Sequence, residues 1–367
     1  MKKVLILGSG MVGRTIARVL AHDFEVTVID ISAAALKKLA GVAGITTLVG
    51  DLQSRSVKSI VAEFDCVVGA MPGRIAYSVL KKIISAGVPI VDISFFEEDP
   101  LLLDQLARKH RTPFLVDFGV APGLSNLMLG REISKGPVSK FICYCGGLPY
   151  SAEAPWFHKS PFEIAGSMDV CTRPARMRID DEIITRPAMS DYEIVYFDGL
   201  GGFEAFSTDG LRTLLRLPIA TMIEKTIRHI GFRRTIRPLI ESGFFSENPL
   251  HINGVLITPF EVTRQLLTKA WALEPKEKEF TLLRLLIEGT SKVRYDLVLH
   301  GDTEPDTTSM AKLAGYPAAA AVHMFAQGLV RKSGVITPEE VGMQSDLAEF
   351  VLNFLRDRGI EFTRISE

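Results

Sequence analysis

Short apolar runs alternate with longer amphipathic segments over the first third of the chain. Most of these runs are rich in β-branched residues and are followed directly by Gly or Asp; they cover residues 4–7, 26–29, 46–49, 66–70, 89–93 and 114–116. Runs that are apolar throughout, rather than alternating, are typical of strands in a parallel sheet that is covered on both faces. The pattern therefore predicts six parallel strands.

Segments of helical period lie between these runs. Ile75, Val79, Leu80 and Ile83 recur at helical spacing, which predicts one helix. Further helices are expected near residues 12–21, 33–40, 54–63 and 100–110. Six strands with five intervening helices indicate an α/β domain built on a doubly wound parallel sheet.

The first turn of this domain carries a glycine motif, Gly8-Ser9-Gly10-Met11-Val12-Gly13, between the first predicted strand and the first predicted helix. In that context Gly8 permits a tight turn, Gly10 leaves room for a pyrophosphate, and Gly13 lets the helix approach the strand. The helix N-terminus would then face the phosphates. We therefore predict a Rossmann domain in which Gly8, Gly10, Met11, Val12 and Gly13 border a dinucleotide.

The second strand ends at Asp30, about 20 residues after the glycine motif, where a carboxylate can accept hydrogen bonds from the ribose hydroxyls. A carboxylate would repel a 2′-phosphate, and the next residues, Ile31 and Ser32, supply no positive charge. Asp30 thus favours NAD over NADP. Lys37 and Lys38 could reach back toward a phosphate, although a solvated helix face is the simpler interpretation.

Later strand ends should meet the rest of the cofactor, because open α/β sheets bind ligands at their carboxyl edge. Asp51, with Leu52, follows the third strand and could cap a helix or contact the adenine. At the ends of the fourth and fifth strands we expect cofactor contacts from Ala70, Met71, Pro72, Asp92 and Ser94.

The pattern changes after residues 117–126. Residues 141–146 alternate like a sheet strand, and residues 194–197 and 204–206 resemble two more. We expect a second α/β domain with a mixed sheet. Residues 308–328 predict a helix rich in small residues, capped by Thr308 or Ser309.

Composition excludes several classes of function. The chain has 367 residues and a formal net charge of −1, with no polybasic or acidic tail, which argues against a general nucleic-acid-binding protein. The apolar run after Met1-Lys2-Lys3 is too short for a signal peptide or a membrane span, so we expect a cytoplasmic protein. The four cysteines show neither a disulfide framework nor metal-ligand spacing. We expect reduced thiols and no metal site.

Several short motifs, in this order along the chain, resemble those of the saccharopine dehydrogenase family, and most closely its lysine 6-dehydrogenase type. Besides the glycine motif they are residues 117–126, Gly146-Gly147-Leu148-Pro149, Thr172-Arg173-Pro174-Ala175-Arg176, residues 203–213, Gly315-Tyr316-Pro317-Ala318-Ala319 and residues 334–339. The resemblance implies three segments: an NAD-binding Rossmann domain (1–126), a substrate and dimerisation domain (127–308), and C-terminal helices (309–367) that return to the first domain. It also implies a homodimer or a dimer of dimers.

The activity that this resemblance implies is NAD-dependent oxidation of the ε-amine of L-lysine to an imine, which hydrolyses to the semialdehyde and cyclises. Alternatives within the same family are dehydrogenases of saccharopine or of carboxyspermidine-type imines. A different class also remains, a dinucleotide-binding sensor that has lost catalysis. The absence of a G-x-S-x-G motif argues against a hydrolase.

An amino acid substrate needs a partner for its carboxylate. Arg212 is the leading candidate, because a guanidinium binds a carboxylate through two parallel hydrogen bonds. The alternative for Arg212 is a structural pair with Asp209. Arg228 and Arg173 are further candidates for substrate binding.

The reacting amine must lose a proton before a hydride can leave. His158, Lys159 and Asp209 are candidates for accepting it, although a histidine in a loop with Trp156 and Phe157 is more often a packing residue. Gly119 and Asn126 are expected to border the nicotinamide.

One position departs from the family pattern. Relatives tend to have Arg followed shortly by Pro-Gly-His, whereas this chain reads Arg228-His229-Ile230-Gly231-Phe232. Phe232 stands in the place of the histidine, which puts the identity of the substrate in doubt.

Overall fold

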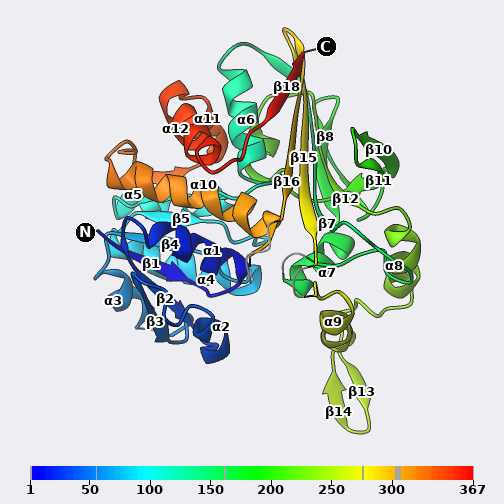
Figure 1. Ribbon diagram of the computed structural model, residues 1–367, viewed down its shortest axis with the longest axis horizontal. Helices are drawn as coiled ribbons and strands as arrows, with labels where there is room; N and C mark the ends of the chain where they lie inside the picture. Colours follow the sequence, from blue (N-terminus) through cyan, green and yellow to red (C-terminus); the bar gives the residue numbers. More distant parts are fainter. Residues whose placement is uncertain (1, 55, 161–162, 275–276, 302–306, 367) are drawn as a thin grey trace. The chain divides into compact units, whose positions relative to one another are not determined.

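The computed structural model describes residues 2–54, 56–160, 163–274, 277–301 and 307–366 (Figure 1). The chain forms two compact units, each assembled from separate segments. Unit 1 comprises Met1–Val138, Arg212–Leu217 and Ala311–Glu361. Unit 2 comprises Ser139–Leu211, Pro218–Met310 and Phe362–Glu367.

Unit 1 contains a parallel sheet of seven strands in the order β17-β6-β5-β4-β1-β2-β3. The strands are β1 (Lys3–Leu7), β2 (Glu25–Asp30), β3 (Ile45–Val49), β4 (Cys66–Gly69), β5 (Ile90–Asp92), β6 (Pro113–Leu115) and β17 (Gly334–Ile336). The doubly wound sheet is confirmed. Its seventh strand, β17, was not expected, because it lies far along the chain from the other six and outside their alternation with helices.

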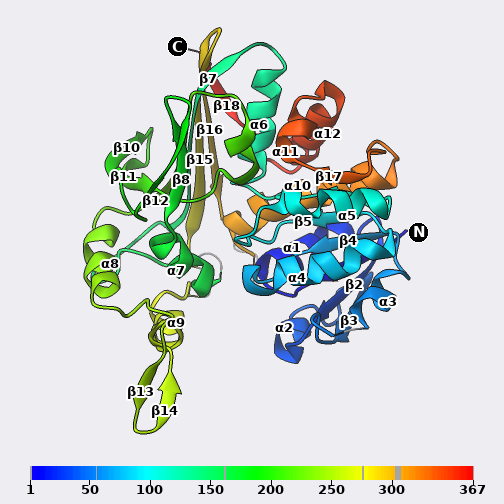
Figure 2. The same ribbon diagram turned by 180° about the vertical axis from the view of Figure 1, so that it is seen from behind.

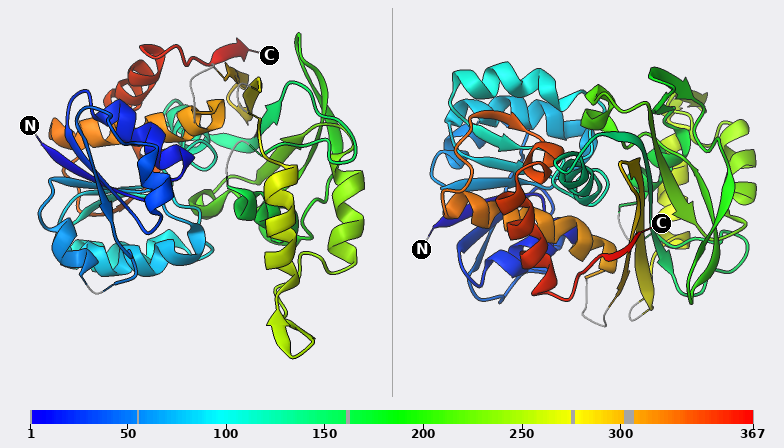
Figure 3. Two further views of the ribbon diagram at one scale, coloured as in Figure 1. Left: turned by 60° about the horizontal axis from the view of Figure 1, so that its bottom comes forward. Right: turned by 90° about the horizontal axis from the view of Figure 1, so that it is seen from above.

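Helices cover both faces of this sheet (Figure 3). On one face α3, α4 and α5 bury apolar side chains against the strands. On the other face, Gly315 of α10 brings that helix against α1, since a Cβ there would lie 3.0 Å from the side chain of Ile16. The helices up to β6 are α1 (Met11–Leu20), α2 (Ala33–Lys37), α3 (Val57–Val61), α4 (Gly73–Ile83), η1 (Ile84–Ala86), η2 (Pro100–Leu103) and α5 (Asp104–Lys109).

Four later helices and one short 3-10 turn complete unit 1: α6 (Leu124–Ile133), η3 (Arg212–Arg216), α10 (Ser309–Ala326), α11 (Pro338–Gly342) and α12 (Ser345–Arg356). Helices α6 and α11 approach closely, because a Cβ at Gly130 would lie 2.2 Å from the Glu339 carbonyl oxygen, and one at Gly342 would lie 2.0 Å from that of Leu127. Helix α11 is therefore packed tightly against α6 within unit 1.

Unit 2 is built on a mixed sheet of nine strands in the described residues, in the order β10-β11-β12-β7-β15-β16-β18, with β8 pairing β12 and β9. Its strands are β7 (Val138–Pro149), β8 (Ala175–Ile179), β9 (Glu182–Arg186), β10 (Glu193–Phe197), β11 (Gly201–Ser207), β12 (Thr221–Arg228), β15 (Glu279–Gly289), β16 (Lys292–His300) and β18 (Thr363–Ser366). The pair β12 and β7 is parallel, whereas β11 and β12 are antiparallel. The mixed sheet is as predicted.

Three helices and a separate hairpin accompany this sheet: α7 (Ile164–Thr172), α8 (Phe232–Glu241), α9 (Pro259–Ala270), and the strands β13 (Leu250–Ile252) and β14 (Val255–Ile257). The helices enclose an aromatic cluster that contains Phe206, Phe232, Phe260 and Trp271. Strands β13 and β14 pair only with each other.

The unit boundaries differ from the expected segments 1–126, 127–308 and 309–367. Unit 1 extends to Val138 because α6 packs on α11, and it takes in Arg212–Leu217. The last residues belong to unit 2, because β18 pairs with β16.

Candidate functional site

The glycine motif forms the turn between β1 and α1. Gly8 has a φ of 111°, and a Cβ there would lie 2.3 Å from the Ala70 carbonyl oxygen. A Cβ at Gly13 would lie 2.2 Å from the Gly8 carbonyl oxygen, whereas one at Gly10 would meet no atom within 4 Å. Packing therefore requires Gly8 and Gly13, and the space at Gly10 is open to a ligand. No side chain caps α1 at Gly10, so the N–H groups of Met11 and Val12 lie at an uncapped helix N-terminus, which suits a phosphate.

The Asp30 carboxylate is held beside this turn. Its Oδ2 accepts a hydrogen bond from the Ser9 N–H at 2.7 Å, and its Oδ1 accepts one from the Ser32 N–H at 2.7 Å. Each carboxylate oxygen can accept a further bond. The neighbouring Ile31 is 73% exposed. Asp30 is thus fixed in position with acceptor capacity left for hydroxyl groups.

The expected contacts at later strand ends form a buried network. Ser94 Oγ accepts a hydrogen bond from the Met71 N–H at 3.1 Å and donates one to Asp92 Oδ1 at 2.9 Å. Asp92 is fully buried, and this burial raises the pKa of its carboxyl group well above the ordinary value. The side chains of Asp92 and Ser94 therefore brace the ends of β4 and β5.

The remaining strand-end candidates hold local turns. Asp51 Oδ1 accepts a hydrogen bond from the Gln53 N–H at 2.8 Å, which favours the capping interpretation, and Leu52 is buried in the core. Ala70 lies against Gly8, and Pro72 is the residue that precedes α4.

Arg212 pairs with Asp117, not with Asp209. Its Nε donates to Asp117 Oδ2 at 2.8 Å, its Nη1 donates to the Phe96 carbonyl, and its guanidinium carbon lies 4.7 Å from the centroid of the Phe96 ring. The side chains of Arg212 and Asp117 are 2% and 1% exposed. These contacts use Nε and Nη1, whereas Nη2 has no hydrogen-bond partner in the described residues. Both residues have left-handed backbones, with φ of 46° and 56°.

Asn126, expected beside the nicotinamide, is 1% exposed and bonded within the protein. Its Oδ1 accepts from the Gly123 N–H and the Ser125 hydroxyl, and its Nδ2 donates to Glu339 Oε2 at 3.2 Å. It therefore links α6 to α11. Gly119 lies in the turn before α6, where a Cβ would lie 3.2 Å from the Pro122 carbonyl oxygen.

Asp209, a candidate proton acceptor, forms a bidentate ion pair. Arg176 Nε donates to Asp209 Oδ1 at 2.9 Å, and Arg176 Nη2 donates to Asp209 Oδ2 at 2.8 Å. Two charge-assisted hydrogen bonds stabilise the ionised carboxylate and occupy both oxygens. The expectation that Asp209 accepts a proton conflicts with this pairing.

His158 lies in the aromatic cluster of unit 2. Its ring contacts Trp271 and Phe232 edge-on, with centroids 4.8 and 5.0 Å apart. Burial, with a smaller contribution from Arg228, lowers the pKa of His158 well below its ordinary value. The imidazole is thus a neutral packing residue, and the catalytic expectation for it has no support in the geometry.

Arg228 is buried next to the same cluster, and its guanidinium carbon lies 5.6 Å from the centroid of the Phe232 ring. Its Nη1 donates to the Ile227 carbonyl at 2.8 Å. Among the described residues, Arg228 Nε, His158 Nε2 and Trp271 Nε1 have no hydrogen-bond partner. The position where the family pattern has histidine is therefore filled by a buried phenylalanine, surrounded by polar atoms without partners.

Lys159 lies in the loop between β7 and α7, and Arg173 directly follows α7. Lys159 is 27% exposed, and its Nζ lies 3.3 Å from Glu277 Oε2. Of the three proton-acceptor candidates, Lys159 has the most exposed side chain, since that of Asp209 is 7% exposed and His158 is buried. Arg173 ends helix α7, and its N–H donates to the Asp169 carbonyl.

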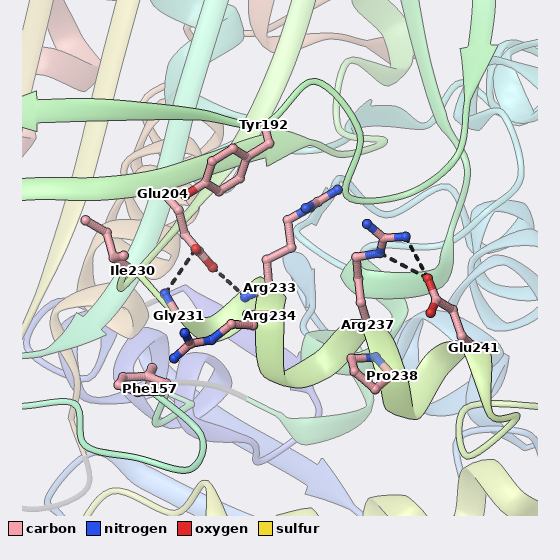
Figure 4. A pocket seen from close by; sticks show the side chains of 10 residues that line it. All are labelled: Phe157, Tyr192, Glu204, Ile230, Gly231, Arg233, Arg234, Arg237, Pro238 and Glu241. Atoms are coloured by element: carbon pink, nitrogen blue, oxygen red, sulfur yellow. Dashed lines mark hydrogen bonds and ion pairs between the residues drawn. The ribbon is translucent and has the colours of Figure 1, made fainter.

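A cavity of about 600 Å³ in unit 2 contains none of the predicted site residues (Figure 4). One of the residues that line it is Glu204, which sequence analysis did not single out. The Glu204 carboxylate accepts hydrogen bonds from the Gly231 N–H at 3.1 Å and the Arg233 N–H at 2.5 Å. It therefore caps α8 and fixes the turn that follows Arg228. A single glutamate in the apolar strand Phe203-Glu204-Ala205-Phe206 was the available signal.

The four cysteines are free thiols. The described residues contain no group of three or more His, Cys, Asp or Glu side chains that could hold a metal ion. In the same part of the chain, no helix is both long enough and apolar enough to cross a membrane.

Comparison with known proteins places these features in one family. Residues 4–115 match the saccharopine dehydrogenase NADP binding domain, and residues 119–360 match the saccharopine dehydrogenase C-terminal domain. The crystal structure of apo saccharopine dehydrogenase (L-Glu forming) from Saccharomyces cerevisiae has a TM-score of 0.82 at 21% identity, covering 100% of both chains.

Two curated relatives are saccharopine dehydrogenases [NADP(+), L-glutamate-forming]. The protein of Pyricularia oryzae is 27% identical over 74% of this chain, and that of Saccharomyces cerevisiae is 25% identical over 72%. In each case the match covers 64% of the relative's length. The two family matches together cover nearly all of the sequence, and so the chain belongs to the saccharopine dehydrogenase family.

Proposed function

We propose that this protein is a dehydrogenase that oxidises a carbon–nitrogen bond of an amino acid with a nicotinamide dinucleotide. The observation that carries the proposal is the turn at Gly8–Gly13, with its open space at Gly10 beside a fixed Asp30, in a chain of this family. When bound, the nicotinamide supplies a hydride acceptor. Gly8, Gly10 and Gly13 would admit the pyrophosphate, and Asp30 would accept the ribose hydroxyls.

NAD is the proposed cofactor, in preference to NADP. The names of the two curated relatives specify NADP(+), but this chain has a carboxylate, Asp30, fixed at the end of β2 beside the glycine turn, and such a carboxylate would repel a 2′-phosphate. The exposed Ile31 next to it provides no compensating charge. Charge repulsion at Asp30 is therefore the basis of the preference.

Arg228 is the proposed partner of a substrate carboxylate, in place of Arg212. Arg212 donates its Nε to the Asp117 carboxylate, whereas Arg228 donates its Nη1 only to a backbone carbonyl; each keeps one nitrogen without a partner in the described residues, Nη2 of Arg212 and Nε of Arg228. Guanidinium donors without partners in an apolar surrounding favour binding of a carboxylate. Phe232 and Trp271 would exclude water from that contact.

Lys159 is the proposed proton acceptor for the reacting amine. It is partly exposed, and its ion pair with Glu277 is a surface contact that a substrate could displace at small cost. The whole-chain resemblance supports the ε-amine of L-lysine as the substrate. The names of the curated relatives support a second candidate, saccharopine.

The test is an assay of the purified protein with NAD or NADP, following nicotinamide absorbance with L-lysine, ornithine, saccharopine and diamines. We expect turnover of L-lysine with NAD, at a rate that rises with pH roughly tenfold per unit below the amine pKa of about 10.4. A protonated amine has no lone pair to expel the hydride. Turnover of saccharopine without turnover of lysine would establish the second candidate. Binding of NAD without turnover of any amine would instead indicate a sensor.

A further inference from the structure

Three arginines of helix α8 line the cavity of about 600 Å³ in unit 2, which we call the arginine cavity. Figure 2 shows that α8 lies next to the ends of β11 and β12. Arg237 follows Arg233 by four positions and Arg234 by three, so that each pair shares a face of the helix. Phe232 and Ile236 on the other side are buried in the aromatic cluster. The volume of the cavity is in the range of sites for small molecules.

The charges on α8 oppose local preference. Arg233 and Arg234 lie in the first turn of the helix, where the helix dipole disfavours positive charge, and this turn contains no acidic side chain. Arg233 and Arg237 lie four positions apart, a spacing at which like charges repel each other. Such a cluster lowers stability unless another group supplies negative charge. Departures of this kind from local preference are expected at functional sites.

Two carboxylates line the cavity, and each already has partners. Glu204 is 2% exposed and accepts hydrogen bonds from two backbone N–H groups at the start of α8. Glu241 accepts two hydrogen bonds from Arg237, at 3.1 and 2.7 Å. The side chains of Arg237 and Glu241 are 50% and 61% exposed, so a ligand could displace this pair at small cost. The lining thus holds three guanidinium groups and two carboxylates, and its net charge is positive.

Arg234 provides the most accessible donors. It is exposed, and its guanidinium forms no hydrogen bond or ion pair with any residue that the structure describes. In Figure 4 its side chain extends toward Phe157. Arg233 donates its Nε to the Met189 carbonyl at 3.0 Å, which leaves its two Nη nitrogens available. Several guanidinium groups at one cavity favour an oxyanion, because each can donate two parallel hydrogen bonds.

Apolar side chains share this lining. Phe157, Ile230 and Pro238 border the cavity, together with Tyr192, whose ring centroid lies 5.3 Å from the guanidinium carbon of Arg233. Sites for small molecules combine such apolar walls with a few charged groups. The mixed lining therefore favours an organic anion over a simple inorganic ion.

We propose that the arginine cavity binds a small organic molecule that carries two or more negative charges on phosphoryl or carboxylate groups. Arg234 and Arg237 would hold the charged groups, and Phe157 and Tyr192 would contact the rest of the molecule. The whole chain has a formal net charge of −1, so general attraction of anions to the protein would not produce such binding. None of the residues proposed for the cofactor or the substrate lines this cavity, and hence the inference does not rest on the proposed function.

The test is calorimetric titration of the full chain at low ionic strength with two probes. Citrate represents the carboxylates, and fructose 1,6-bisphosphate represents the phosphoryl compounds. We expect at least one of them to bind with a dissociation constant below about 1 mM. Added NaCl should weaken this binding, since the contacts are between charges near the surface.

Arg234→Gln should raise the dissociation constant of the bound probe at least about tenfold, because charge-assisted hydrogen bonds are lost. The matched control is Arg264→Gln on α9, which removes a helical arginine that pairs with Glu261 outside the cavity. It should leave the affinity unchanged. Without a probe, the thermal midpoint of Arg234→Gln should equal or exceed that of the unaltered protein, because a positive charge leaves the first turn of α8.

Binding of citrate alone would assign the cavity to carboxylates, and binding of fructose 1,6-bisphosphate alone would assign it to phosphoryl compounds. Absence of binding by both probes would overturn the proposal. Equal affinity in Arg234→Gln would also overturn it, since the anion would then bind elsewhere, for example at the glycine turn. A lowered thermal midpoint of Arg234→Gln without a probe would show that Arg234 stabilises the fold itself, and this result too would contradict the proposal.

Discussion

Arg212 shows how a single residue type can suggest a role that its surroundings exclude. Sequence motifs cannot reveal that Asp117 lies next to Arg212, because 95 positions separate them. Burial raises the pKa of the Asp117 carboxyl group, and the paired guanidinium of Arg212 opposes this effect only in part. The residue is therefore expected to act on stability more than on substrate binding.

We predict that Arg212→Ala lowers the free energy of unfolding by about 3 to 5 kcal/mol, because it leaves the buried Asp117 carboxylate without its partner. Urea denaturation followed by circular dichroism measures this. The control, Arg216→Ala, removes an exposed pair with Asp99 from the same 3-10 turn and should cost at most about 1 kcal/mol. Unchanged stability of Arg212→Ala together with a raised KM for the amino acid would restore Arg212 as the carboxylate partner.

His158 makes stability depend on pH. Its pKa in the folded protein lies below the unfolded value of about 6.5. Above that pH the imidazole is neutral in both states. As the pH falls below it, the unfolded chain binds a proton that the folded protein does not, and the free energy of unfolding decreases by up to about 1.4 kcal/mol per pH unit until the folded pKa is reached.

His158→Phe should remove this loss, since phenylalanine does not titrate. As the pH falls from 7 to about 5, the free energy of unfolding of His158→Phe is therefore predicted to rise relative to that of the unaltered protein. Urea titrations at each pH measure it. Parallel curves for the two proteins would show that His158 is accessible to protons in the folded state.

At the scale of elements, the turn between β1 and α1 was predicted because its glycines, strand and helix are adjacent in sequence. The turn at Gly231 illustrates the opposite case. Glu204 caps the helix that follows it from a different strand, and no local pattern records that contact. Strands β13 and β14 were also missed, although Asn253-Gly254 between two apolar runs is a local hairpin signal.

Gly10 and Gly13 provide a matched pair of variants in this turn. Gly13→Ala is predicted to cost about 1 to 3 kcal/mol of stability, because its Cβ would overlap the Gly8 carbonyl oxygen. Gly10→Ala should leave stability unchanged within about 0.5 kcal/mol and weaken NAD binding at least about tenfold, since its methyl group would occupy the space of the pyrophosphate. Thermal unfolding and calorimetric titration with NAD measure the two effects. Unaltered NAD affinity in Gly10→Ala would show that the dinucleotide does not approach this turn.

At the scale of the whole molecule, each folded unit is assembled from segments that lie far apart in the chain. Local periodicity located the six strands up to residue 116 and the helix at 308–328, but it could not show that Gly334–Ile336 extends the sheet beside β6. Nor could it show that Arg212–Leu217 belongs to unit 1. These contacts join residues far apart in the chain. Forming them costs loop-closure entropy, and no local sequence pattern shows which distant segments will pair.

This order predicts that residues 1–138 do not form a stable domain alone. They lack β17, which covers the edge of β6, and they lack α11, against which α6 packs at Gly130. A fusion that joins residues 1–138 to residues 311–361 through a flexible linker should fold, provided that Asp117→Asn is included, because Arg212 is then absent and a buried carboxylate would have no partner. We expect a cooperative thermal transition and calorimetric binding of NAD for the fusion, and neither for residues 1–138. Cooperative unfolding of residues 1–138 alone, with NAD affinity equal to that of the fusion, would contradict the requirement for the C-terminal segment.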